Sequence, residues 1–117
     1  MSARAQHVMS ASKMMFDMFK DDLFSEDTQA FIQGIASSME KRAHELSREM
    51  TRQLIGDEDA LTAHADSMRS IIKFIEELPK DIERGKKYPK SPIFMKTALE
   101  RSCYLYAQFQ AMEMGLK

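Results

Sequence analysis

Apolar residues recur at helical spacing along most of this chain, and no segment alternates apolar and polar residues as a strand does. The clearest pattern lies between residues 25 and 56, where apolar positions are three or four residues apart. That spacing is typical of the a/d seam of a heptad repeat. The seam comprises Ile32, Ile35, Met39, Ala43, Leu46, Met50 and Leu54. The sequence therefore predicts an all-α protein, a small helical bundle of about four helices with one long heptad-patterned helix, and an oligomer.

The long helix has recognisable ends. Ser25 is a good N-cap, Glu26 and Asp27 complement the helix dipole in the first turn, and Gly56 suits the left-handed conformation that follows a helix. About 30 residues in a helix span roughly 45 Å. A compact domain of this chain length has a radius of gyration of only ~13 Å. We therefore expect the helix to bend near Gly34 or to project into an oligomer.

The remaining segments complete a single all-helical domain. Pro79 is expected to end the second amphipathic helix, because the residue before a proline avoids the α region. Ser91 and Pro92 are a favoured N-cap and first residue for the last helix. The predicted parts are an N-terminal helix or arm (1–24), two amphipathic helices (25–78), a basic, proline-containing linker (79–92) and a C-terminal helix (92–115).

Eleven methionines are spread over the chain, and several lie in its first helix. Methionine is flexible and polarisable, so it fills irregular cores and also suits adaptable binding surfaces. The first helix is therefore either a core-facing amphipathic helix or an arm that packs on another subunit or partner. Met9, Met14 and Met18 are the residues on which this alternative depends.

Composition narrows the class of protein further. A net charge of −1 argues against general nucleic-acid binding. The lone Cys103 excludes a disulfide framework and indicates a reducing compartment, the cytoplasm. Apolar runs such as Met14–Phe16 are far too short to cross a membrane.

Candidate chemistry is sparse. Glu40 and His44 lie one helical turn apart and His64 follows, but the paired motifs of a metal-binding bundle are missing, so no metal is expected. Cys103 has no base near it in sequence and is expected to be a buried, inert thiol. No phosphate loop or nucleophile elbow is present. We expect a protein without a catalytic site and without a cofactor.

A basic segment before the last helix is the strongest candidate for binding an anion. Lys86, Lys87 and Lys90 lead into Ser91 at a helix N-terminus, where free amides and the helix dipole favour phosphate. Tyr88 adds a ring on which a base can stack. The plainer interpretation is a solvated basic loop.

The run from Thr97 to Tyr104 resembles a Thr-x-Leu-Glu-x-small-x-aromatic pattern in phage anti-defence sponges. These are the anti-CBASS cyclic-nucleotide sponges and their anti-Thoeris relatives. A helix that ends at Leu78, a polar turn and a final helix follow the order of that family's C-terminal hairpin. The chain differs from the family at Lys90–Ile93, where the family has Ser-Arg-Glu, and at Leu105–Tyr106, where it has Trp-Ala.

The resemblance implies a homo-oligomer in the host cytoplasm that sequesters a cyclic nucleotide immune messenger without cleaving it. The heptad seam would then supply oligomer contacts. The expected ligand-binding residues are Lys86, Lys87, Tyr88, Lys90, Ser91, Thr97 and Arg101. The alternative is a small helical adaptor or inhibitor that binds a protein partner through a Met-rich hydrophobic face.

Overall fold

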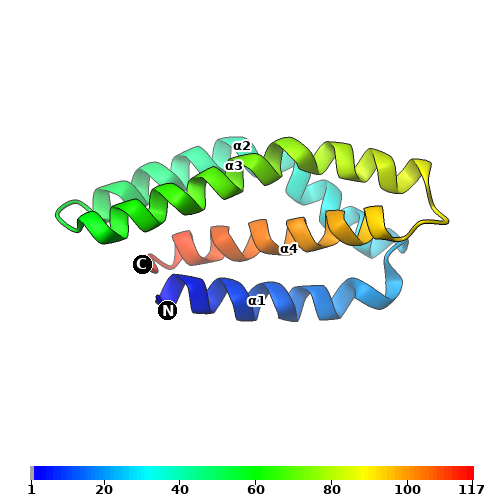
Figure 1. Cartoon of the computed structure of the whole chain (residues 1–117), viewed down its shortest axis with the longest axis horizontal. Coiled ribbons are helices and arrows are strands. Elements are labelled where there is room, and N and C mark those ends of the chain that lie inside the picture. Colours follow the sequence, from blue (N-terminus) through cyan, green and yellow to red (C-terminus); the bar gives the residue numbers. More distant parts are fainter. Residues whose placement is uncertain (1) are drawn as a thin grey trace.

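The computed structural model describes residues 2–117 (Figure 1). This part of the chain contains four helices and one short 3-10 turn, joined by short connections. Within this part of the chain there is no strand, so the prediction of an all-α bundle of four helices is confirmed. The elements in chain order are α1 (Ala3–Phe19), η1 (Lys20–Asp22), α2 (Glu26–Gln53), α3 (Glu58–Lys87) and α4 (Ile93–Glu113).

Helix α4 lies at the centre of the bundle, between α1 and the pair formed by α2 and α3 (Figure 1). Its apolar residues surround the helix instead of forming one stripe, as expected for a helix covered on more than one side. Met95, Leu99, Cys103 and Leu105 are almost completely buried. They join α2 and α3 residues in one hydrophobic cluster.

The heptad seam of α2 packs inside the chain. Ile32, Met39, Ala43, Met50 and Leu54 are buried, and most of the seam shares a cluster with residues of α3 and α4. The seam is therefore part of this chain's own core. Whether the protein forms an oligomer stays a prediction.

The length of α2 is accommodated by the shape of the whole molecule. The bundle measures 50 × 24 × 18 Å, and its radius of gyration over Cα atoms is 14.8 Å. Helix α2 continues through Gly34 without interruption. A long helix therefore fits along an elongated bundle without projecting from it. Figure 1 shows the N-terminal part of α2 running at an angle to the rest of the helix, which agrees with the expected bend.

Helix α3 continues through Pro79 to Lys87, so the predicted end of the helix at residue 78 and the linker over 79–92 are wrong. A proline inside a helix loses one backbone hydrogen bond and crowds the carbonyl four residues earlier. Packing beyond the proline outweighs that cost, since Asp81 and Ile82 are buried and Gly85 lies against Met95. Figure 1 shows α3 changing direction part-way along its length.

The connection between α3 and α4 is shorter than the sequence suggests. It comprises residues 88–92, and the Ser91 amide donates to the Tyr88 carbonyl at 3.0 Å. The N-cap of α4 is Pro92, which makes no side-chain capping bond. The prediction of Ser91 as N-cap and Pro92 as first helical residue is therefore one residue too early.

Other helix ends follow the sequence. The Ser25 and Asp57 side chains accept from the amides of Thr28 and Ala60 at the starts of α2 and α3. Gly56 and Gly115 have φ values of +96° and +68°, in the left-handed region that glycine adopts at low cost.

Helix α1 belongs to the bundle and lies along α4 (Figure 1). Val8 is buried, and Met15, Phe16 and Phe19 pack at the edge of the core. The Arg4 amide donates to the Lys117 carbonyl at 3.1 Å, which places the two chain ends side by side. In this structure the first helix therefore packs on the core of its own chain, as the first of the two alternatives predicted.

Candidate functional site

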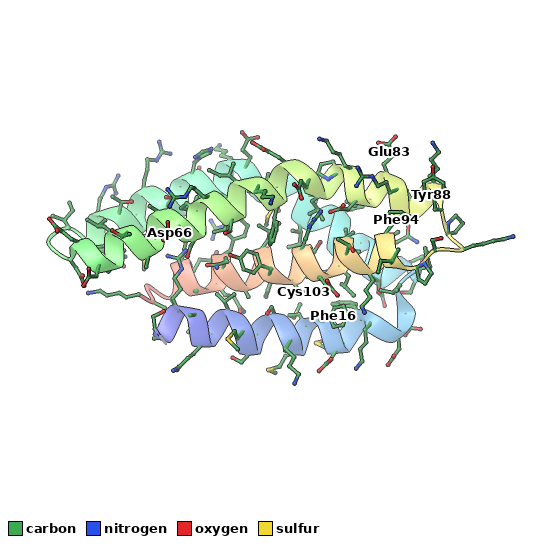
Figure 2. The ribbon with its side chains drawn as sticks, viewed as in Figure 1. Phe16, Asp66, Glu83, Tyr88, Phe94 and Cys103 are labelled. Carbon is green, nitrogen blue, oxygen red and sulfur yellow. The ribbon has the colours of Figure 1, made fainter. Side chains whose placement is uncertain are left out.

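The predicted basic segment lies at the end of the molecule where α3 passes to α4. An open cavity of about 390 Å³ is found there, and Figure 2 shows Tyr88, Phe94 and Glu83 grouped at this end. The residues that line it are Lys80, Glu83, Arg84, Lys87, Tyr88 and Phe94. Three cations, one acid and two aromatic rings therefore share one surface, which we call the basic end cluster.

The two rings contact each other beside the lysines, with their planes tilted by 41°. The centroids of Tyr88 and Phe94 are 5.6 Å apart, and the Nζ atom of Lys87 lies 5.5 Å from the centroid of Tyr88. Tyr88 is exposed. An exposed ring next to cations is the arrangement on which a nucleobase stacks while its phosphate is neutralised.

The charge of this end is largely uncompensated. Lys80, Lys86, Lys87 and Lys90 form no ion pair among the described residues, and Arg84 pairs with Asp81 only at 3.9 Å. The lysines sit in the last turns of α3 and in the loop after it. Cations at a helix C-terminus are stabilised by the dipole, which explains why they are tolerated together there.

The structure brings together only part of the predicted set. Lys87 and Tyr88 line the cavity, while Lys86 and Lys90 are exposed next to them in the chain. The amide of Ser91 makes the turn hydrogen bond to the Tyr88 carbonyl, and Ser91 does not line the cavity. Thr97 does not line the cavity, and its hydroxyl donates to the Ile93 carbonyl at 2.8 Å within its own helix.

Arg101 lies elsewhere and has other partners. Its guanidinium pairs with Asp81 and with Glu77, the latter at 3.0 Å, and lies 5.5 Å from the centroid of Phe74. Asp81 is almost fully buried. Arg101 therefore joins α4 to α3 and is not part of the basic end cluster.

Sequence reasoning missed Phe94 as a member of the cluster and placed Lys80 and Arg84 in a linker. Because α3 continues, Lys80, Arg84 and Lys87 are spaced four and three residues apart and share one helix face. That spacing was visible in the sequence. Pro79 concealed it, since a proline normally argues against a continuing helix.

The methionines of α1 form a second exposed feature. Met14 and Met18 are 68% and 70% exposed and lie one helical turn apart, and Met9 is 61% exposed on another side of the helix. Large apolar side chains exposed in neighbouring positions suit protein contacts. Met14 and Met18 therefore form an exposed apolar strip on which a protein partner could bind, as the adaptor or inhibitor alternative requires.

The remaining candidates offer no reactive site. Cys103 is completely buried, and burial, with a smaller contribution from Glu100, raises the pKa of its thiol to about 12. Across residues 2–117 no three His, Cys, Asp or Glu side chains are grouped as metal ligands. None of the helices described is both long and apolar enough to span a membrane.

Comparison with known proteins gives no match among family models, curated proteins or solved structures.

Proposed function

We propose that this protein is a non-enzymatic binder that sequesters a nucleotide through the basic end cluster. The observation that carries the proposal is the exposed Tyr88 ring, in contact with Phe94, beside Lys80, Arg84 and Lys87. Stacking on a ring and neutralisation of phosphate by lysine are the two contacts that nucleotide binding needs. The resemblance of the last helix to the phage sponges supports a cyclic nucleotide immune messenger as the ligand, held in the host cytoplasm by a homo-oligomer.

Sequestration requires that the protein bind its ligand but not react with it. The side chains of the basic end cluster are suited to binding a phosphorylated ligand. Lysine, arginine and aromatic side chains hold a phosphorylated ligand without supplying a general base. The cluster is open, so a messenger can enter without movement of the fold. Glu83 is the one acid among the lining residues.

The test is a thermal-shift panel of purified protein with cyclic dinucleotides, cyclic trinucleotides and ADP-ribose-type messengers. A ligand at about 100 times its Kd stabilises the fold by ~2.7 kcal/mol, or roughly 10 °C for a domain of this size. The Lys87→Glu and Tyr88→Ala variants should abolish the shift. Lys41→Glu, the same charge change on the exposed face of α2, should keep it. Chromatography of the released ligand should recover it unchanged.

A panel without any shift, or equal shifts for Lys87→Glu and the wild type, would contradict binding at this cluster. Recovery of a cleaved nucleotide would contradict sequestration.

A second candidate, an adaptor or inhibitor of a protein partner, is favoured by the exposed Met14 and Met18. The Met14→Gln, Met18→Gln double variant keeps side-chain length and removes apolar surface. If this candidate is right, a partner captured by the wild type is lost with the double variant and retained with Lys87→Glu. The opposite pattern favours the nucleotide binder.

A further inference from the structure

A buried arginine lies at the end of the bundle opposite the basic end cluster, where α1 begins (Figure 1). Arg4 is only 6% exposed. Its Nε donates to the Oε1 of Gln108 at 3.2 Å, and its Nη1 donates to the Nδ1 of His64 at 2.7 Å. Its Nη2 is buried and has no hydrogen-bond partner.

No carboxylate of the described residues pairs with Arg4. A guanidinium remains charged in proteins, and a buried charge is normally paired. Arg101, the other arginine with a largely covered side chain, has two carboxylate partners. Arg4, in contrast, has no carboxylate partner in the described part of the chain, and one of its nitrogens makes no hydrogen bond.

The two side-chain partners of Arg4 cannot replace a carboxylate. Because Nδ1 of His64 accepts from Arg4, its ring proton is on Nε2 and donates to the Oγ of Ser47, 3.0 Å away. The ring is then neutral, and burial followed by the charge of Arg4 lowers the pKa of His64. Gln108 in turn donates to the hydroxyl of Tyr104 at 3.0 Å, so it is held in a neutral network.

Arg4 lines a cavity of about 310 Å³. Its walls include Val8, Met9 and Leu54, and its polar groups include Ser67 and Tyr104. Lys117, whose backbone oxygen accepts from the Arg4 amide, also lines it, and no acidic side chain of the described residues does. A volume near the lower end of the ~300–1,000 Å³ range suits a small ligand. The chemistry that fits is a single anionic group for Arg4 and a hydrocarbon body for the walls.

We propose that this cavity binds a small organic carboxylate, with the planar carboxylate on the Arg4 guanidinium. A carboxylate matches the geometry of a guanidinium, whose adjacent nitrogens donate in parallel. The apolar walls favour a monoanion with an aliphatic or aromatic body over a free phosphate. This site is separate from the basic end cluster, and the proposal does not depend on the proposed function.

The test uses hexanoate and benzoate as probes, with hexanamide and benzamide as uncharged controls of the same size. Both carboxylates should raise the Tm of the full chain in a saturable way, and the amides should not. Arg4→Met keeps most of the side-chain volume and removes the charge, so it should abolish the shift. Arg69→Met, the same change at an exposed arginine, should leave the shift intact. Failure of both carboxylates up to their solubility limit would overturn the proposal.

A second measurement needs no variant, which matters if Arg4→Met does not fold. In ¹H–¹⁵N spectra of the wild type, hexanoate should shift the Nε–H signal of Arg4 and the amides around Ala5, Ala63 and Gln108. Shifts centred on Tyr88 and Phe94 would place the anion at the basic end cluster and overturn this proposal, while leaving the proposed function standing. Unchanged spectra would show that only water enters the cavity, and would also overturn it.

Discussion

Arg4 and Arg101 illustrate how the surroundings decide what a side chain does at the residue scale. Both are arginines with covered guanidinium groups, and nothing in the local sequence separates them. Arg101 meets Asp81 and Glu77 of α3 and becomes a connection between helices. The side-chain partners of the Arg4 guanidinium are both neutral, and no described carboxylate side chain pairs with it beside the cavity that it lines.

Replacement of Arg101 by alanine should destabilise the fold. The change leaves the buried carboxylate of Asp81 with only Arg84, 3.9 Å away, as a partner. We expect a cost of about 3 kcal/mol, at the low end of the range for buried pairs, because Arg101 is partly exposed and Arg84 remains. The matched control is Arg69→Ala, which removes an exposed pair with Asp66 and should cost at most ~0.5 kcal/mol. Urea unfolding of the two variants measures the difference. Equal midpoints would contradict the role of Arg101 in joining the helices.

Two glycines in helix interiors should respond in opposite directions to alanine. At Gly34 an added Cβ meets nothing within 4 Å, so alanine should stabilise the fold by about 1 kcal/mol through helix propensity. At Gly85 the Cβ would lie 3.3 Å from the backbone of Met95. Overpacking costs ~1–3 kcal/mol, which exceeds the gain from helix propensity. Gly85→Ala should therefore lower the free energy of unfolding by about 1 kcal/mol. Thermal unfolding provides the test, and a gain at both positions would contradict a close α3–α4 contact.

At the scale of elements, the continuation of α3 past Pro79 determines the candidate site. If the helix ended at Leu78, then Lys80, Arg84 and Lys87 would share no face. The continuing helix instead aligns them beside the rings of Tyr88 and Phe94. The proline is retained inside α3 because Ile82 and Gly85 pack against the rest of the bundle.

Pro79→Ala should therefore raise the free energy of unfolding. Alanine restores the backbone bond and removes the ring clash, worth up to ~3 kcal/mol in a helix interior, while the freer unfolded chain offsets ~0.4–1 kcal/mol. We expect a net gain of about 2 kcal/mol in urea unfolding. Pro89 lies in the loop after α3, so Pro89→Ala restores no helical hydrogen bond. Only the freer unfolded chain counts, and the free energy of unfolding should fall by about 0.5 kcal/mol. If both variants had a lower free energy of unfolding, residue 79 would lie in a non-helical linker, which would contradict the continuous α3.

At the scale of the whole molecule, the bundle is elongated and has two chemically different ends. The basic end cluster lies at the α3–α4 turn, and the Arg4 cavity lies where α1 begins and α4 ends (Figure 1). The core between them is continuous and includes the seam of α2. Ligands at the two ends are therefore expected to bind independently unless the fold itself responds.

A charge in the seam should unfold a single chain and not merely separate subunits. Met39 is 3% exposed in the core, so Met39→Glu buries a carboxylate without a partner and should abolish the helical circular dichroism signal at all protein concentrations. Met18→Glu makes the same change at a side chain that is 70% exposed and should keep the signal. A folded Met39→Glu protein with altered oligomer mass would contradict an intramolecular seam.

The sequence by itself determined the features that depend on neighbouring residues. The capping serine and aspartate at positions 25 and 57 and the glycines at 56 and 115 fix helix ends through bonds within a few residues, so four helices and most of their bounds were predictable. Lys87 and Tyr88 were found because they are adjacent in the chain. Tertiary structure alone decided the continuation past Pro79, the intramolecular seam and the different surroundings of Arg4 and Arg101. Each depends on packing between residues far apart in the chain, where burial outweighs the local preference of a proline or a charge.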